Sequence, residues 1–330
     1  MTNTSDCAIC YVADENFLFA TLASALSLRR FVPAEQAEIL LFLTGKPQRD
    51  LAKLDADLDR LGVRLMPLLD DDVFRLTAER WRQSHISVAT LGRLLIGETV
   101  AKTHRRMLYV DGDTYFARDP SALLRHRASP GTIWAADDII SYNRFDHGRL
   151  GTAARRYLDD LGIPADQRYF NSGIILADVA TWRAMAAEAL DVYMTRSDHC
   201  VNYDQSALNI VAGSRRSPLP IRWNFQTGFA DLKLASAVEP AILHFTGSIK
   251  AWHGPLQPWQ DLFPFYQEVE QRVAHIVARP AWPDQQIAER NAISRRNYRK
   301  LHLMFAHRVW RKRRQIIAAE RQAARNFGSD

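Results

Sequence analysis

Short apolar segments alternate with helix-like segments through the first 66 residues of this 330-residue chain. Residues 8–13, 39–43 and 63–66 are apolar runs of strand length, whereas residues 17–28 and 49–61 carry apolar side chains at helical spacing. Parallel strands need a crossover connection between them, and that connection is usually a helix. The alternation therefore predicts an α/β fold built on a parallel, doubly wound sheet.

The same alternation continues toward the C-terminus. We expect strands at residues 108–110, 133–136, 169–177 and 241–245, and helices at 85–100, 149–161, 179–194, 202–211 and 263–277. The polar, turn-rich residues 141–168 indicate an excursion over one face of the sheet. No Gly-x-Gly-x-x-Gly follows the first strand, so the sequence lacks the ordinary dinucleotide-binding fingerprint.

Composition narrows the class of protein. No window offers the ~20 uncharged apolar residues that span a membrane, and residues 1–6 do not resemble a signal peptide. The three cysteines are few and odd in number, which suits a reducing compartment. Cys7 and Cys10 could form a redox pair or half of a zinc site, but they lie within an apolar strand pattern, which favours two buried strand cysteines.

Two aspartates, Asp111 and Asp113, flank Gly112 directly after the apolar residues 108–110. In an extended segment residues i and i+2 point the same way, so the two carboxylates would lie side by side. Such a pair repels itself unless a positive group holds it, and Mg²⁺ or Mn²⁺ prefers oxygen ligands. Gly112 lets the chain turn and lets a ligand approach the backbone. The alternative is a surface turn, because Asp-Gly is common turn chemistry.

Further polar groups follow strands or open helices, and in a parallel sheet such ends can share one edge. They are Asp14 and Asn16, Asp137 and Asp138, Asn171, Asp204 and Gln205, and His244 and Lys250. His244 could complete a metal site with the two carboxylates, and Lys250 near Gly247 suits a diphosphate. The alternatives are a capping role for Asp204, a solvated helix position for Arg93 and an ordinary loop position for His85.

The ordered motifs resemble those of the family-8 retaining glycosyltransferases, especially the bacterial lipopolysaccharide and lipooligosaccharide galactosyl- and glucosyltransferases. The matching segments cover about 250 residues: 14–17, 85–93, 111–113, 170–173, 204–205, 223–224 and 244–252. The resemblance implies a GT-A fold, which is a mixed, mostly parallel nucleotide-binding sheet flanked by helices. It also implies a UDP-sugar donor and Mn²⁺, for which Mg²⁺ could substitute.

Carried over to this sequence, the resemblance implies a role for each matching residue. Asp111, Asp113 and His244 would bind the metal against the UDP diphosphate, which Gly112, Gly247 and Lys250 would also contact. The uridine would lie on residues 12–16, with Val12, Ala13, Asp14 and Asn16 as contacts. Arg93, Asn171, Asp204 and Gln205 would hold the donor sugar, and His85 and Asp138, the latter preferred over Asp137, would line the acceptor side.

The sequence departs from the family pattern at two positions. Ser206 stands where many members have a second Asp after the Gln, and Ala251 replaces the usual Pro. Both departures bear on the fit of the donor sugar, so galactose and glucose both stay open. Retention could arise by double displacement or by front-face substitution, and the front-face route is favoured because a glutamine amide is a poor nucleophile.

A basic tail follows a boundary marked by Pro280, Trp282 and Pro283, so we expect a catalytic domain at residues 1–279 and a tail at 280–330. Residues 286–327 carry twelve Arg and Lys against two Glu, a net charge of +10 within a chain of net charge +6. Leu301, Met304, Phe305, Val309 and Ile316 fall on one helical arc, which favours a basic amphipathic helix on anionic inner-membrane lipid. A solvated or partner-binding tail is the alternative, and no nucleic-acid partner is expected because the chain shows no recognition module.

These patterns together predict a cytoplasmic, peripherally membrane-attached, Mn²⁺-dependent retaining hexosyltransferase. It would move galactose or glucose from a UDP-hexose to a lipopolysaccharide or another cell-surface glycan. The alternatives are a related transferase that acts on a protein or glucan acceptor, and a nucleotide-sugar binding protein without catalysis.

Overall fold

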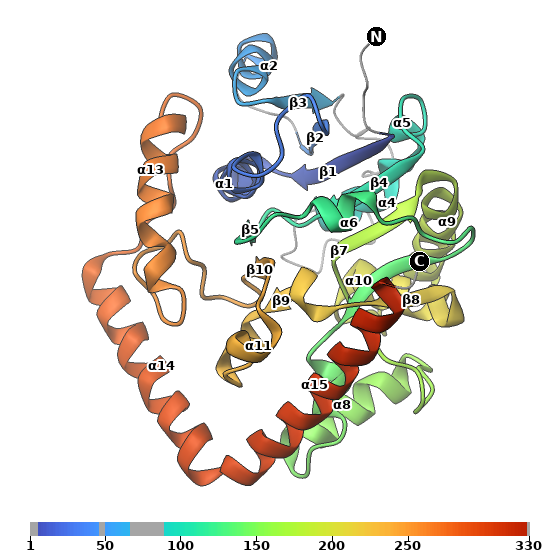
Figure 1. The fold of residues 1–330 in the computed structure, drawn as a ribbon, viewed down its shortest axis with the longest axis vertical. Coiled ribbons are helices and arrows are strands. Elements are labelled where there is room, and N and C mark those ends of the chain that lie inside the picture. Colours follow the sequence, from blue (N-terminus) through green and yellow to red (C-terminus); the bar gives the residue numbers. More distant parts are fainter. Residues whose placement is uncertain (1–5, 46–49, 67–88, 329–330) are drawn as a thin grey trace.

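The computed structural model describes residues 6–45, 50–66 and 89–328. A seven-stranded sheet with the order β3-β2-β1-β4-β7-β6-β8 forms its centre, and a three-stranded sheet with the order β5-β10-β9 lies beside it (Figure 1). The strands are β1 (Cys7–Ala13), β2 (Ile39–Leu43), β3 (Val63–Met66), β4 (Arg106–Val110), β5 (Thr114–Phe116), β6 (Ile133–Asp137), β7 (Phe170–Asp178), β8 (Arg216–Leu219), β9 (Phe225–Gln226) and β10 (Ile242–His244).

Helices cover both faces of the large sheet. The helices of the body are α1 (Leu18–Arg29), α2 (Leu51–Asp59), α4 (Ala89–Leu95), α5 (Gly97–Val100), α6 (Ser121–Arg125), α7 (Ile140–Asn143), α8 (Arg149–Asp160), α9 (Val179–Arg196), α10 (Tyr203–Ala212), α11 (Thr227–Asp231), α12 (Ala235–Val238) and α13 (Phe263–Val273). Two long helices, α14 (Asp284–Met304) and α15 (Ala306–Gly328), complete the chain.

The alternation of side chains along β1 explains why the sheet needs helices on both sides. Ile9 and Tyr11 belong to one apolar core with α1, α2 and α13, whereas Ala8 and Cys10 belong to a second core with α4, α9 and α10. Successive residues of a strand face opposite sides, so an apolar run is buried on both faces. The described cysteines, including Cys7 and Cys10, are buried and free, as the strand pattern predicts.

The parallel pairing that the alternation over residues 8–66 predicts is confirmed for β1, β2 and β3, but the complete sheet is mixed. β1, β2, β3 and β4 run parallel, and β6 pairs parallel with β8, but β7 runs antiparallel to both β4 and β6. The predicted excursion over residues 141–168 includes α8 and most of α7. It connects the end of β6 to the start of β7 at the same edge of the sheet, so β7 runs in the opposite direction. The mixed, mostly parallel sheet implied by the family resemblance is confirmed.

The small sheet was not anticipated as a separate unit. β5 follows β4 after a short turn, β10 pairs antiparallel with β5, and β9 pairs parallel with β10. This arrangement places the end of β10 next to the turn that contains Asp111 and Asp113.

The C-terminal tail packs against the body instead of forming one continuous amphipathic helix. α14 ends at Met304 and α15 turns back across the body, so the two helices form a V (Figure 1). Val309 and Ile316 are only 6% and 0% exposed and belong to the core of the body. The predicted single apolar arc is therefore wrong, because its two halves lie on different helices and part of it is buried. Among the described residues, no helix is long and apolar enough to cross a membrane.

Candidate active site

Three potential metal ligands converge where the two sheets meet. Asp111 follows β4, Asp113 precedes β5 and His244 ends β10, whose register places it opposite Thr114. One ligand atom from each residue lies within 4.8 Å of the others, and His244 Nε2 is 3.2 Å from Asp113 Oδ1. The two carboxylates meet across a turn, whereas the sequence argument assumed one extended segment.

Lys250 already pairs with one of these carboxylates. Its Nζ lies 2.6 Å from Asp113 Oδ2 and donates to the carbonyl of Phe245, also at 2.6 Å. Burial by itself would raise the pKa of Asp113, but Lys250 and His244 outweigh it and hold this pKa well below its usual range. Asp113 is therefore ionised at neutral pH.

Asn224 orients the His244 ring. The Asn224 Nδ2 group donates to Asn171 Oδ1 at 2.9 Å, so Asn224 Oδ1 is the atom that faces His244 Nδ1 at 2.8 Å. Because an amide oxygen only accepts, His244 Nδ1 donates to it, which turns Nε2 toward the two aspartates and makes Nε2 the ring nitrogen that a cation would take. Metal-binding histidines use the same kind of support.

The backbone around the three ligands leaves no room for a larger residue. A Cβ atom on Gly173 would lie 2.2 Å from His244 Cε1 and 2.7 Å from Asp111 Oδ2. The Gly173 carbonyl also accepts from the Asp111 backbone N–H at 2.8 Å. Two carboxylates and one imidazole in this tight arrangement fit a hard divalent cation such as Mn²⁺ or Mg²⁺.

Arg93 is buried at the centre of an ion network. Its guanidinium lies 3.0 Å from Asp111 Oδ1 and 2.8 Å from Asp204 Oδ2, and it donates to Ser172 O at 2.8 Å. Its CZ atom is 4.6 Å from the centre of the Tyr109 ring, within cation–π range. The alternative of a solvated Arg93 is therefore wrong.

Asn202 holds the N-cap position of α10 but makes no side-chain capping bond, whereas the Asp204 carboxylate accepts from backbone N–H groups of the first turn, so part of the predicted capping role is present. Burial raises the pKa of Asp204 to about 6, although Arg93 opposes the shift. The Arg93–Asp204 pair thus links α4 to α10 directly beside Asp111.

A hydrogen-bonded chain leads from this centre to Asp138. Gln205 Oε1 accepts from Ser172 N at 3.0 Å, and Gln205 Nε2 donates to Asp138 Oδ2 at 3.3 Å. Asn171 Nδ2 donates to the same oxygen at 3.1 Å. Burial raises the pKa of Asp138, although these bonds lower it in part.

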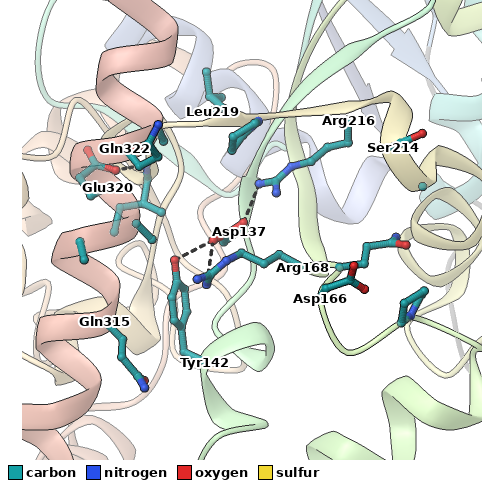
Figure 2. A pocket seen from close by; sticks show the side chains of 18 residues that line it. Asp137, Tyr142, Asp166, Arg168, Ser214, Arg216, Leu219, Gln315, Glu320 and Gln322 are labelled. Atoms are coloured by element: carbon teal, nitrogen blue, oxygen red, sulfur yellow. Dashed lines mark hydrogen bonds and ion pairs between the residues drawn. The ribbon is translucent and has the colours of Figure 1, made fainter.

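Asp137 points into a different pocket (Figure 2). Its carboxylate lies 2.7 Å from Arg216 and 3.4 Å from Arg168, and it accepts from the Tyr142 hydroxyl at 2.7 Å. This pocket of about 810 Å³ is closed on one side by α15. Asp138, and not Asp137, therefore reaches the group around Arg93 and His244.

The remaining predicted site residues lie around this group. Val12 and Ala13 are buried at the end of β1, and Asn16 is exposed. Asp14 Oδ1 accepts from Phe17 N at 2.9 Å and caps the 3₁₀ turn Glu15–Phe17. Gly112 fits closely against Thr21, and Gly247 is exposed with φ +89°. His85 and the predicted N-cap Ser87 lie outside the described residues.

Comparison with known proteins identifies the family of this chain. The family model for glycosyl transferase family 8 matches residues 8–255. The chain belongs to glycosyltransferase family 8. Its described fold, a mixed and mostly parallel sheet flanked by helices, matches GT-A glycosyltransferase structures.

Two curated relatives and one crystal structure illustrate the likeness of this family-8 chain. General stress protein A of Bacillus subtilis is 27% identical over 274 residues, which is 77% of this chain and 90% of that protein. The lipopolysaccharide 1,2-glucosyltransferase of Escherichia coli is 24% identical over 267 residues, covering 76% and 74% of the two chains. The galactosyltransferase LgtC, crystallised with donor and acceptor sugar analogues, superimposes with a TM-score of 0.62 at 19% identity, covering 86% of this chain and 99% of that one.

Sequence reasoning assigned no role to three groups that hold the predicted site residues in place. Tyr109 donates to Asp111 Oδ1 at 2.8 Å, Ser172 links Arg93 to Gln205, and Asn224 holds His244. Tyr109 could have been found from its position two residues before Asp111 on a strand. Asn224 lies in the segment 223–224, which belongs to the family resemblance, but the resemblance gave it no role.

Proposed function

We propose that this family-8 glycosyltransferase moves a hexose, galactose or glucose, from a UDP-sugar with retention at the anomeric carbon. The reaction would depend on Mn²⁺, for which Mg²⁺ could substitute. The proposal rests on one observation, the convergence of Asp111, Asp113 and His244 with Lys250 paired to Asp113. A cation bound by these three residues would neutralise the charge that develops on the departing diphosphate.

The residues around the cluster suit the parts of a UDP-sugar. Lys250 lies on Asp113 and could share its charge with a diphosphate, while the exposed backbone at Gly247 leaves room for phosphate oxygens. The end of β1, from Val12 to Asn16, offers backbone groups and Asp14 to the uridine. Arg93, Asn171, Asp204 and Gln205 surround the place for the hexose.

The chemistry that these groups favour is front-face substitution. Asp204 is paired with Arg93, Gln205 Oε1 already accepts from Ser172, and Ser206 is buried and bonded to the Tyr157 hydroxyl at 2.7 Å. None of these offers a free carboxylate to the anomeric carbon. The acceptor oxygen would bond to that carbon on the side where the UDP oxygen leaves, and its proton would pass to the departing diphosphate.

The role of Gln205 can be tested separately. We expect Gln205→Ala to slow transfer because the amide positions Asp138 and lies next to Ser172. No glycosyl-enzyme adduct should accumulate in the wild-type protein during turnover, as measured by intact-protein mass spectrometry. Near-normal turnover of Gln205→Ala would exclude a covalent role for this residue, whereas a trapped adduct on it would exclude the front-face route.

The acceptor is proposed to be a lipopolysaccharide or another cell-surface glycan. The name of the E. coli relative supports this choice, and Asp138 at the end of the hydrogen-bonded chain would bind an acceptor hydroxyl. His85 is proposed for the same side. A related transferase with a protein or glucan acceptor would keep the donor site unchanged and would differ only in this half of the reaction.

The decisive experiment is a screen of UDP-sugars for hydrolysis and transfer with Mn²⁺, Mg²⁺ or EDTA. We expect UDP release from UDP-galactose or UDP-glucose with Mn²⁺ and no release with EDTA. Tight binding of UDP-sugars without release would support a binding protein that has lost catalysis. Equal release with EDTA would overturn the metal-dependent mechanism.

We also propose that the protein is cytoplasmic and attached to the inner face of the membrane through residues 280–330. The tail has a net charge of +10 between residues 286 and 327, and its elbow exposes Leu303 (79%) and Trp310 (59%). Because Val309 and Ile316 are buried, only the elbow between α14 and α15 would insert into lipid. Co-sedimentation with phosphatidylglycerol vesicles should be lost in the double variant Leu303→Ser/Trp310→Ser, and equal sedimentation of both proteins would contradict this proposal.

A further inference from the structure

A second cavity of about 410 Å³ lies between α14 and two segments of the body, the helix α11 and a loop. The loop contains residues 249–260, and α14 contributes the facing wall. The side chains that carry the argument are Thr227, Gln257, Gln260, Ser294, Asn297 and Tyr298. The cavity is therefore built jointly by the catalytic body and the C-terminal tail.

Both segments are continuous in sequence with the metal and diphosphate region. Thr227 follows Gln226, which is the register partner of His244 in the small sheet. Ile249 precedes Lys250, whose Nζ lies on Asp113. The cavity is therefore lined by residues that are adjacent in sequence to those of the proposed reaction centre.

The α14 wall is held firmly on the loop that carries Lys250. Arg290 donates to Ser248 Oγ at 3.0 Å, while Asn291 accepts from Gln257 N at 2.9 Å and donates to Pro255 O at 3.0 Å. Ile287 packs so closely that a Cβ atom on Gly254 would lie 2.3 Å from its Cδ1. The cavity therefore has a preformed shape, which limits the ordering cost of a ligand.

The polar lining of the cavity has unused hydrogen-bonding capacity. Thr227 Oγ1 and Gln260 Oε1 are buried atoms without a hydrogen-bond partner among the residues that the structure describes. Buried polar atoms normally have partners, so a pair of unsatisfied ones in a single cavity points to a ligand or solvent that supplies them. Asn297 and Ser294 add neutral donors and acceptors.

The chemistry of the lining selects a class of ligand. Its groups are amides, hydroxyls, the Tyr298 ring and the Asp231 carboxylate, with apolar contacts from Ile249 and Pro258, and no Lys or Arg is among the lining residues that the structure describes. An anion would lack a counter-charge there. A sugar ring presents hydroxyls that both donate and accept, together with an apolar C–H face that packs on aromatic and aliphatic side chains.

We propose that this cavity is a subsite for an uncharged sugar residue of the acceptor glycan, distinct from the residue that receives the hexose. The inference rests on the proposed glycosyltransferase function and adds that α14 takes part in acceptor recognition. The tail would then bind the glycan chain as well as position the protein at a membrane.

The test is binding of the full-length protein, with Mn²⁺ and UDP present, to a printed array of bacterial oligosaccharides. We expect the wild-type protein to bind array glycans and the Tyr298→Ala and Asn297→Ala variants to bind the same glycans about tenfold more weakly. Gln286→Ala, at an exposed position of the same helix that does not line the cavity, is the matched control and should bind like the wild type. Thermal unfolding identifies a variant that is misfolded. If one variant is misfolded, glycan binding by the other variant tests the subsite.

Three outcomes would overturn the subsite. They are no glycan binding by the wild-type protein, unchanged binding by both variants, or a parallel loss of UDP affinity in both variants. Failure of the proposed function would look different. In that case the wild-type protein releases no UDP from any UDP-hexose, while the two variants still lose glycan binding.

Discussion

Two acidic pairs lie at the ends of β4 and β6, the strands on either side of β7, yet the surroundings of the two pairs differ. Asp111 and Asp113 meet His244 and Lys250 at the junction of the two sheets, whereas Asp137 and Asp138 separate to opposite sides of the end of β6. Asp137 pairs with Arg216 and lies near Arg168, so its charge is already compensated by fixed guanidinium groups.

The difference shows that a pair of carboxylates is not by itself a metal site. Arg93 and Tyr109 hold only one oxygen of Asp111, and the other oxygen, Asp113 and His244 Nε2 face one another. With Lys250 beside them, these groups suit a cation and an anionic ligand. Around Asp137, two arginines and the Tyr142 hydroxyl satisfy the carboxylate from within the protein. The partners of each carboxylate decide its role, and the following changes would break or sharpen this contrast.

The largest effect is expected from Asp113→Asn. The substitution removes one proposed ligand and the charge partner of Lys250, so Mn²⁺-dependent hexose transfer should fall by roughly 10³-fold, because a bound cation supplies several kcal/mol of charge stabilisation. Initial rates over a Mn²⁺ series measure the effect. Asp160→Asn, on the exposed surface of α8, is the control. Full Mn²⁺-dependent activity of Asp113→Asn would mean that Asp111 and Asp113 do not form a metal site and differ from Asp137 and Asp138 only in their partners.

Asp137→Asn should act on stability and not on turnover. It leaves the buried Arg216 guanidinium without its counter-charge, and breaking a buried pair in this way costs about 3 kcal/mol. Urea unfolding should show the loss, with unchanged hexose transfer per folded molecule. Asp166→Asn, at the exposed rim of the same pocket, should change stability by less than about 0.5 kcal/mol. A loss of transfer without a loss of stability would place Asp137 in the reaction.

Asn224→Ala should lower the affinity of the site for Mn²⁺, although it replaces none of the three proposed metal ligands. His244 loses the acceptor that fixes its ring, and the loss of such support typically costs 10- to 100-fold in metal affinity. Titration of the protein with Mn²⁺, with free Mn²⁺ measured by electron paramagnetic resonance, gives the affinity. Unchanged affinity would mean that the β10–β5 pairing alone orients His244.

The smallest effect concerns Glu320 of α15, which lines the same pocket as Asp137. It accepts from the backbone N–H of Ile221 at 2.6 Å, while burial raises its pKa to about 7. A raised carboxyl pKa means that the protonated form favours folding, so stability should decline as the pH rises from about 4.5 to 7. Glu320→Gln should remove that decline and exceed the wild type at pH 8 by on the order of 2 kcal/mol.

Urea midpoints of the wild type and Glu320→Gln at pH 5 and pH 8 measure this difference. The Glu320→Ala variant is measured alongside them, because it removes both the carboxyl group and the hydrogen bond to Ile221 N, in the segment that leads to Asn224. Identical pH profiles of the wild type and Glu320→Gln would show that Glu320 does not titrate in this range.

Much of the fold and of the candidate site follows from local patterns. Apolar runs and helical spacing located most strands and helices, because a strand that is buried on both faces of the sheet requires a continuous apolar run in the sequence. The spacing of Asp111, Gly112 and Asp113, together with the residues His244 and Lys250, indicated the cation chemistry before the fold was known. These features depend on residues close in sequence or on strong residue-type preferences.

Other features depend on contacts between distant segments, and only the tertiary structure decided them. The antiparallel entry of β7, the opposite directions of Asp137 and Asp138, and the orientation of His244 by Asn224 all arise from pairings that no local pattern encodes. The tail is the clearest case. Its composition predicts an amphipathic helix, but the apolar side chains Val309 and Ile316 are buried in the body, because an apolar stripe by itself does not specify whether lipid or protein will cover it.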